Sequence, residues 1–380
     1  MLRRSQDERD FPVKFQRYGA VAGVAVAASL ALSACGSDNN NASSGSSSTP
    51  TGTSAASACP SGTLSLAGST AQQNAISQWK KDYQTQCTGV TVDYNGNGSG
   101  AGVTSFIQKQ ADFAGSDYAL SSTQAGQVTS AGRCGSGSAV DIPAVTGAIA
   151  VLFNVPGVKS LDLSAKVISE IYDGTITNWN NAAIKAANPT ATLPNLAIQP
   201  FYRSDTSGTS YNFSNYLNAL GGFAAANKQW PGKTGQGAKG SSAVAAKVKA
   251  VSGAIGYAEY SYATSDDLAY AEVSNAAGTF VPLTQANAAN FISQAKVTQS
   301  NGTTLAFNYQ YSSATAYPAT LVTYEIACGT GNDSTALPLI KGFLTYLVSA
   351  AAQNSFTSEG YVPLTSSLQT TDAAVINSLS

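Results

Sequence analysis

Thr63-Leu-Ser-Leu-Ala-Gly-Ser-Thr70 is the stretch that sets the fold of this 380-residue chain. It predicts a short strand over 63–67, which turns at small residues and leads into an amphipathic helix. The same order of strand, turn and helix recurs twice more, with strands predicted over 90–94 and 111–116. Three such units in succession indicate an open α/β sheet, and sheets of this kind bind ligands outside the carboxyl ends of their strands.

The composition excludes several kinds of function. Charged residues make up only 11% of the chain, and 20 Lys and Arg are balanced by 21 Asp and Glu. Nucleic acid is therefore not expected as a partner, because its backbone is bound by clustered Lys and Arg. The chain has no His, which rules out Ser-His-Asp and Cys-His catalysis and any His-containing metal site. We expect no cofactor and no metal.

The N-terminal part has the pattern of an export signal and a tether. Five cationic and three anionic residues precede an uncharged run over 19–34, which is too short to span a bilayer comfortably and is typical of a signal peptide. The run ends in Leu-Ser-Ala-Cys35, which resembles the lipobox of bacterial lipoproteins, so 1–34 is predicted to be a signal peptide and Cys35 to be lipidated. A short anchor with an incidental Cys is the alternative. Residues 35–58 are almost all Ser, Asn, Gly, Thr or Ala and are predicted to form a disordered tether.

Four further cysteines predict two disulfides, because an even number in an exported chain favours complete pairing. They are Cys59, Cys87, Cys134 and Cys328, and three connectivities are possible. Cys59 precedes the first predicted strand and Cys87 ends the first predicted helix. We therefore expect this pair and, by elimination, a bond between Cys134 and Cys328. Metal binding is the weaker alternative, since no two cysteines have the Cys-x-x-Cys spacing.

Polar turns follow several of the predicted strands, at 68–70, at 98–102 and at Asp117. A fourth, Arg203-Ser-Asp-Thr-Ser-Gly-Thr209, collects a guanidinium, a carboxylate and four hydroxyls before an amphipathic helix, for which Ser207 is the candidate cap. Free N–H groups at a helix start, together with hydroxyls and an Arg, suit a small oxyanion. An ordinary capped surface loop is the alternative for each turn alone. Four turns at equivalent ends of successive units favour a shared site.

Three short motifs raise the alternative of an enzyme. Ser77-Gln-Trp-Lys80, Lys233-Thr-Gly235 and Ser37-Asp-Asn39 match the signatures of penicillin-recognising enzymes. The last of them precedes the first and falls in the predicted tether, and the Lys-Thr-Gly run lies between glycines and not on a predicted strand. Ser99 lacks the Gly-x-Ser-x-Gly elbow, since residue 97 is Asn. We therefore do not expect an enzyme, because such motifs mean little without their structural context.

From about residue 64 to residue 363 the chain resembles the phosphate-binding protein of the bacterial phosphate-specific ABC transporter. The segments that carry the resemblance are Ala67-Gly-Ser-Thr70, Gly98-Ser99 with Gly102, Phe113-Ala-Gly-Ser-Asp117, Arg203 to Thr209, Trp230-Pro231 with its Gly- and Lys-containing loop, and Gly253-Ala-Ile-Gly-Tyr-Ala-Glu259. Their order and spacing together make it specific. The resemblance implies an α/β, two-lobed fold of the periplasmic-binding-protein-like type II, with the ligand cleft between the lobes.

The resemblance also implies a phosphate site with residues from both lobes. The implied phosphate-binding residues are Thr70, the backbone N–H of Ala71, Ser99 and Asp117 from one lobe, and Arg203, Ser207, Gly208 and Thr209 from the other. Asp205 is implied to orient Arg203. Asp117 would accept a hydrogen bond from a protonated phosphate oxygen, which sulfate cannot offer. The chain departs from the family at Ala71, where Phe is usual, and we expect this change to affect lobe packing more than phosphate binding.

The expected organisation places 59–141 and about 311–380 in lobe one, and 142–310 in lobe two. The resemblance implies high-affinity binding of inorganic phosphate outside the cytoplasm and its delivery to an ABC-type importer. The partners would be the membrane permease subunits with their cytoplasmic ATPase, and the lipid anchor would hold the protein at the outer face of the bacterial cytoplasmic membrane. The alternatives are a protein for another tetrahedral oxyanion such as sulfate, a phosphoester-acting enzyme, and an adhesive surface lipoprotein.

Overall fold

The structure is a computed structural model that describes residues 59–298 and 302–380. Its main sheet has the strand order β2-β1-β3-β14-β4-β8-β6-β7, and β15 and β9 also pair with β4. These strands are β1 (Gly62–Gly68), β2 (Val90–Asn95), β3 (Phe113–Ser116), β4 (Ala139–Asn154), β6 (Gln199–Arg203), β7 (Gln236–Ala238), β8 (Ala254–Glu259), β9 (Ala269–Tyr270), β14 (Thr320–Cys328) and β15 (Tyr361–Val362). The predicted signal peptide, the predicted lipidation site Cys35 and the predicted tether lie outside the described residues.

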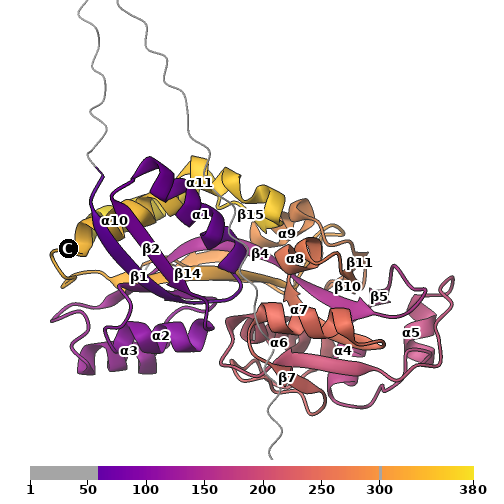
Figure 1. Ribbon diagram of the computed structural model, residues 1–380. Coiled ribbons are helices and arrows are strands. Elements are labelled where there is room, and N and C mark those ends of the chain that lie inside the picture. The colour runs from indigo at the N-terminus through magenta and orange to yellow at the C-terminus, as the bar shows by residue number, and fades with distance from the viewer. Residues whose placement is uncertain (1–58, 299–301) are drawn as a thin grey trace, which may run out of the picture. The chain divides into compact units, whose positions relative to one another are not determined.

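The first three strand, turn and helix units form as the sequence predicts. Strand β1 pairs in parallel with β2 and with β3. The helices that follow the three strands are α1 (Gln73–Gln86), α2 (Ser99–Ile107) and α3 (Ser122–Ser130). Figure 1 shows α1 on one face of these strands and α2 and α3 on the other. Helix α1 buries Trp79 and Tyr83 on one face, so it is amphipathic, as predicted.

Strand β4 runs through both halves of the main sheet. Its first part, 139–148, pairs antiparallel with β14, and its last part, 149–154, pairs antiparallel with β8. Nearly all of its 16 residues are buried, because helices cover both faces.

Separate hydrophobic clusters form around the two halves of the sheet. One includes Trp79 from α1 and Phe343 from α10, and the other includes Trp179 and Tyr257. Residues of β4 belong to both clusters. The clusters support two lobes, while the limits of each lobe in the sequence stay a prediction.

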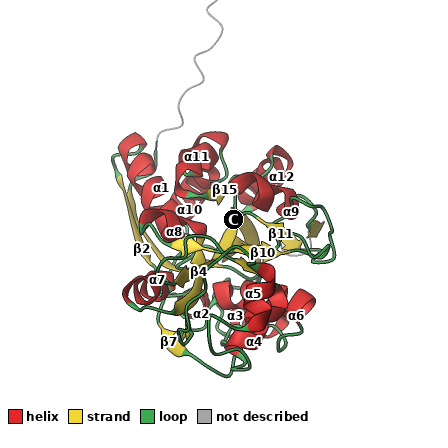
Figure 2. Ribbon diagram, turned by 90° about the vertical axis from the view of Figure 1, so that its right-hand side faces the viewer, coloured by secondary structure: helices red, strands yellow, loops and turns green. Residues whose placement is uncertain are grey.

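The remaining elements pack around this sheet, with helices on both of its faces (Figure 2). The middle of the chain supplies α4 (Ala165–Tyr172), α5 (Ala182–Ala187), α6 (Gly208–Gly221), α7 (Ser241–Ala250), α8 (Tyr260–Ser265) and α9 (Gln285–Ile292). It also forms a small sheet of β5 (Asp162–Leu163), β10 (Glu272–Ser274) and β11 (Phe280–Val281), and a hairpin of β12 (Lys296–Thr298) and β13 (Thr304–Ala306).

The C-terminal return lies against the first strands. It contains α10 (Leu337–Leu347), α11 (Ala350–Ser355), a short 3-10 helix (Thr357–Glu359) and α12 (Ser366–Ser378). Helix α10 has Pro338 in its first turn, where no intrahelical N–H is needed. It buries Phe343 and Leu344, as expected of a core helix. Among the helices of the described ranges, none is long and apolar enough to cross a membrane.

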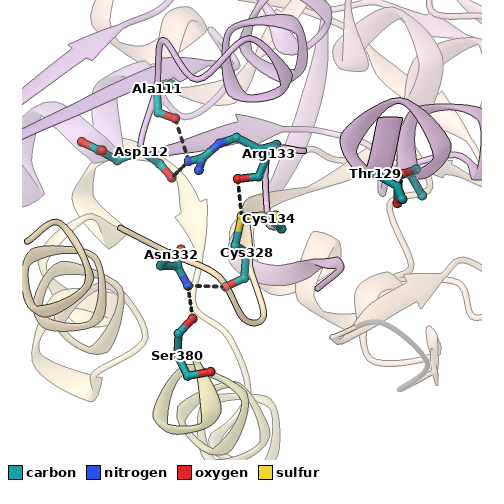
Figure 3. The surroundings of a disulfide bond; sticks show 9 residues. Ala111, Asp112, Thr129, Arg133, Cys134, Cys328, Asn332 and Ser380 are labelled. Atoms are coloured by element: carbon teal, nitrogen blue, oxygen red, sulfur yellow. Dashed lines mark hydrogen bonds between the residues drawn. A yellow bond between two sulfur atoms is a disulfide. The ribbon is translucent and has the colours of Figure 1, made fainter. Parts of the chain in front are cut away.

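Two disulfides fasten the first lobe. Cys59 is bonded to Cys87 and Cys134 to Cys328, which are the predicted pairs. The second bond joins the loop after α3 to the end of β14, at a sequence separation of 194. Next to it, the guanidinium of Arg133 donates to the carbonyl oxygens of Ala111 and Asp112 at 3.1 and 2.7 Å (Figure 3).

Candidate functional site

The polar turns of the first lobe meet at one edge of the sheet. Thr70 follows β1, Ser99 starts α2 after β2, and Asp117 follows β3. The backbones are very close here, since a Cβ on Gly68 would lie 2.1 Å from the carbonyl oxygen of Gly115. Gly68 also has a φ of +149°, so only glycine suits this position. Parallel strands with short turns therefore bring three predicted site residues together.

The carboxylate of Asp117 is the centre of this cluster. It accepts hydrogen bonds from the hydroxyls of Ser69 at 2.5 Å, Thr323 at 2.8 Å and Ser99 at 3.0 Å. Asp117 is only 2% exposed. Burial raises its pKa to about 6, and the nearby charge of Glu259 also raises the pKa while the three hydroxyls lower it. Ser69 lies in the predicted polar turn at 68–70, whereas Thr323 of β14 was not among the predicted site residues.

Arg203 lies at the end of β6 and is held in one orientation. Its Nε and Nη2 donate to the two carboxylate oxygens of Asp205 at 2.8 and 2.5 Å, and its Nη1 donates to the hydroxyls of Thr209 and Ser241 at 3.1 and 3.0 Å. Burial alone would raise the pKa of Asp205, but the hydrogen bond and charge of Arg203 outweigh it and lower that pKa. The geometry is the one that the resemblance implied for Asp205.

The start of α6 closes against the first lobe. Ser207 is its N-cap, and its hydroxyl accepts from the backbone N–H of Ser210 at 3.1 Å, as predicted. A Cβ on Gly208 would lie 2.4 Å from the Cβ of Asp117 and 2.8 Å from the hydroxyl of Ser99. The N–H groups of the first turn of a helix have no partner inside the helix. Glycine at 208 thus lets these donors approach Asp117 closely.

Ser241 is a site residue that the sequence analysis missed. It begins α7 directly after Gly240, whose φ is +81°. Its hydroxyl lies 3.0 Å from that of Thr70, and its backbone N–H donates to the Thr70 hydroxyl at 3.2 Å. Because Arg203 also donates to Ser241, this serine links the two lobes. The signal was a Gly-Ser pair before a helix, the same pattern as Gly98-Ser99.

Glu259 was noted only as part of a matching segment, and the structure places it in the same cluster. It is 2% exposed, and its Oε1 accepts from the hydroxyl of Thr209 at 2.6 Å. Its Oε2 is buried and has no hydrogen-bond partner in the described part of the chain. Since Thr209 accepts from Arg203 and donates to Glu259, its hydroxyl hydrogen is already engaged.

The backbone around Ala71 is fixed by side chains from both ends of the chain. The N–H of Ala71 donates to the hydroxyl of Ser69 at 2.9 Å, so a role of this N–H in anion binding stays a prediction. Tyr361 donates to the carbonyl of Ala71 at 2.6 Å, and Tyr262 donates to that of Thr70 at 2.9 Å. The methyl group of Ala71 is fully buried in the hydrophobic cluster of the second lobe, which supports the expectation that residue 71 acts through packing.

The cluster combines hydrogen-bond donors with the carboxylates of Asp117, Asp205 and Glu259. Arg203 is the cation in direct contact with the cluster, and Asp205 already engages two of its nitrogens. The other positive contributions are the N-termini of α2, α6 and α7, which begin at Ser99, Gly208 and Ser241. In the part of the chain that the structure describes, no group of three or more Cys, Asp or Glu could hold a metal ion.

The enzyme motifs do not enter this cluster. Ser77 is exposed on α1, and its hydroxyl donates to the carbonyl of Gln73 at 2.7 Å. Lys233 has a side chain that is 74% exposed, with its nitrogen 3.7 Å from Asp173. The Ser37 motif lies outside the described residues. Within the described residues, neither Ser77 nor Lys233 lies at the polar cluster.

Comparisons with known proteins agree with this architecture. The family model of the PBP superfamily domain matches residues 53–351. Phosphate-binding protein PstS 2 of Mycobacterium tuberculosis is 38% identical over 377 residues, which cover 97% of this chain and 100% of that protein. Phosphate-binding protein PstS 3 of Mycobacterium leprae is 35% identical over 382 residues, with 97% and 100% covered.

Solved structures share the fold. A periplasmic phosphate-binding protein named PfluDING, bound with phosphate, has a TM-score of 0.67 and 23% identity, covering 82% of this chain and 93% of that one. A putative phosphate ABC transporter substrate-binding protein from Clostridium perfringens has a TM-score of 0.59 and 20% identity, with 80% and 100% covered. The predicted two-lobed, type II binding-protein fold is confirmed. The chain belongs to the PstS family of phosphate-binding proteins, within the PBP superfamily.

Proposed function

We propose that this protein binds inorganic phosphate between its lobes, outside the cytoplasm, and delivers it to an ABC-type phosphate importer. The observation that carries the proposal is a buried polar cluster between the lobes: the starts of α2 and α6 lie against Asp117, and Arg203 donates to Thr209 and to Ser241 at the start of α7. A desolvated anion is costly unless donors surround its oxygens. Helix starts, hydroxyls and a guanidinium provide such donors.

Asp117 would give the site its preference for phosphate. A carboxylate offers about four acceptor positions, and the hydroxyls of Ser69, Thr323 and Ser99 occupy three of them. One acceptor position therefore remains for a ligand. Phosphate keeps a proton near neutral pH and can donate it there, whereas sulfate has none and would meet a repelling charge.

The eight residues implied by the resemblance form the proposed site, with Ser241 as an addition. Thr70, Ala71, Ser99 and Asp117 contribute from the first lobe, and Arg203, Ser207, Gly208 and Thr209 from the second. Bonds across the lobes, such as Gly100 N–H to the carbonyl of Thr206 at 3.0 Å, would break when the cleft opens to admit phosphate. Residues 59–141 with about 311–380, and 142–310, are the proposed moving lobes.

The proposed anchor is a lipid on Cys35, after removal of 1–34. The tether predicted from the sequence over 35–58 would let the body reach permease subunits at the outer face of the membrane. Metabolic labelling with a radioactive fatty acid tests the anchor: the wild type is expected to be labelled and the Cys35→Ala variant not. An equally labelled variant would place the lipid elsewhere or exclude it.

Calorimetric titration tests the proposed ligand. Purified protein is freed of bound anion by unfolding, dialysis and refolding, and is then titrated with phosphate and with sulfate at pH 7.5. We expect tight, one-to-one binding of phosphate and far weaker binding of sulfate. Equal affinity for the two anions would favour a protein that binds oxyanions in general. If neither anion gives a heat of binding, the proposal is refuted. Steady hydrolysis of a phosphomonoester would point to an enzyme instead.

A further inference from the structure

A second buried acid, Glu325, lies beneath the proposed site and has no part in it so far. It belongs to β14, where it pairs with Gly115 of β3 on one side and Ile142 of β4 on the other. Its side chain is fully buried. Both of its carboxylate oxygens are without a hydrogen-bond partner in the described ranges. A bare carboxylate in such a place is very costly, so its environment needs an explanation.

The neighbour of Glu325 on this face of the sheet is the amide of Gln72. A Cβ on Gly115 would lie 2.0 Å from Nε2 of Gln72 and 3.1 Å from the hydroxyl of Tyr94. Directly opposed residues of antiparallel strands point to the same face, with their Cβ positions about 5 Å apart. The missing side chain at 115 thus makes room for Gln72 beside Glu325, and the two are close enough to interact.

A chain of hydrogen bonds leads from Gln72 to the site. Its Nε2 donates to the hydroxyl of Tyr94 at 3.0 Å, and this hydroxyl donates to the carbonyl of Ser69 at 2.5 Å. The side chain of Ser69 donates in turn to Asp117 at 2.5 Å. Tyr94 has a single hydrogen, which Ser69 takes, so Tyr94 must accept from Gln72. The orientation of the Gln72 amide is thereby fixed, with Oε1 away from Tyr94.

Tyr94 takes one of the two hydrogens on Nε2 of Gln72, while the acceptors beside this amide have no partner. Oε1 of Gln72 and both oxygens of Glu325 are buried and unpartnered within the described residues. A single proton on Glu325 would turn one of these acceptors into a donor. Burial raises the pKa of Glu325 to about 8, with the nearby amide of Gln72 lowering it and the charge of Asp117 raising it, so a neutral acid also agrees with the electrostatics.

We propose that Glu325 carries a proton at neutral pH, packs in its neutral form against the amide of Gln72, and acts as a positioning residue for the phosphate site. The neutral acid holds Gln72, and Gln72 holds Tyr94 and Ser69 in the arrangement that fixes Asp117. This inference rests on the proposed binding of phosphate. Of the two acids Asp117 and Glu325, only Asp117 then carries a negative charge, and Asp117 is the acceptor for the ligand.

Loss of this proton would weaken phosphate binding at alkaline pH. The titratable groups around Glu325 are Asp117 after β3 and Tyr94 from β2, and Tyr262 from α8 acts in turn on Tyr94. The pKa of Tyr94 is raised well above 10 by burial, with Glu325 contributing, so its phenol stays neutral in this range. Ionised Glu325 would add a second buried negative charge close to the bound anion.

The test compares the wild type with Glu325→Gln, which is neutral at every pH. Phosphate affinity is measured by calorimetry from pH 6 to pH 9, and the ratio of the two affinities removes the titration of phosphate itself. We expect a constant ratio up to about pH 7, then about twofold weaker binding by the wild type at pH 8 and about tenfold at pH 9, because binding requires the protonated form. A ratio that stays constant to pH 9 would overturn the positioning role. Glu359→Gln, in the short 3-10 helix, is the matched control.

A second readout needs no ligand. The folded pKa of Glu325 lies above its unfolded value, so the wild type is stabilised by the group at low pH and loses this as pH rises to about 8. The unfolding temperature of the wild type should therefore fall relative to Glu325→Gln between about pH 5 and pH 8, and the difference should level off above. No change with pH would show that Glu325 holds no proton.

The two readouts separate the possible failures. If the wild type binds no phosphate, the proposed function fails, while the unfolding comparison still reports the proton on Glu325. If Glu325→Gln does not fold, infrared spectroscopy of the wild type replaces it. A protonated-carboxyl band that titrates with a midpoint near pH 8 is expected, and its absence at neutral pH would refute the proposal.

Discussion

Replacing Asp117 by Asn should reduce both the affinity for phosphate and the preference over sulfate. Oδ1 of Asp117 accepts from Ser69 and Thr323, and Oδ2 accepts from Ser99 alone. The free acceptor position is therefore on Oδ2. An Asn that keeps its oxygen between Ser69 and Thr323 places an NH2 group at this position. The amide can donate to Ser99, but it cannot accept the hydrogen of phosphate.

The expected magnitude is that of one charged hydrogen bond. Such a bond contributes about 1.5–3 kcal/mol, so phosphate affinity should fall about ten- to hundredfold. Sulfate should bind more tightly than to the wild type, because the negative charge that repels it is gone. Competition calorimetry at pH 7.5 measures both affinities. Asp93→Asn, an exposed residue of β2, is the control and should leave both unchanged.

The pH dependence gives a second check on Asp117. Its pKa of about 6 in the ligand-free protein is above the ordinary value of 3.8, so the carboxyl becomes protonated as pH falls through 6 and loses its role as acceptor. Wild-type affinity should decline below pH 6, and that of Asp117→Asn should decline less. A variant with the wild-type ratio of phosphate to sulfate affinity would refute the assignment of selectivity to Asp117.

Three further changes test the arrangement around the site. Ser241→Ala removes a hydroxyl that links the lobes. We expect phosphate binding to be weaker by about 1 kcal/mol and phosphate release in stopped-flow measurements to be faster. An unchanged release rate would contradict the idea that this hydroxyl holds the cleft closed. Gly208→Ala places a methyl group 2.4 Å from the Cβ of Asp117, so calorimetry should detect no phosphate binding, while the unfolding temperature of the ligand-free protein stays close to that of the wild type. Replacing Cys134 and Cys328 together by Ala opens a bond between residues 194 apart, and denaturant unfolding should show a loss of about 2–5 kcal/mol; no loss would mean that the bond does not constrain the unfolded chain.

The order of strands and helices could be predicted from the sequence because neighbouring residues determine it. Small residues after each short strand, and helices with one apolar face, predicted the units that begin at β1, β2 and β3. The cap at Ser207 and the pairs Cys59–Cys87 and Cys134–Cys328 followed from position in the sequence. The family resemblance then assigned roles to residues from Thr70 to Thr209, and the structure brings several of these residues into one hydrogen-bonded cluster.

The sequence alone therefore determined the strand, turn and helix units, because backbone propensity and apolar periodicity act over neighbouring residues. Only the tertiary structure revealed Thr323, Ser241, Glu259 and Glu325 around Asp117. Strand β14 enters antiparallel between β3 and β4, about two hundred residues after Asp117 in the chain, and α7 reaches Thr70 from the other lobe. Such pairing depends on which distant surfaces bury one another, and no local pattern at Thr323 or Glu325 records it.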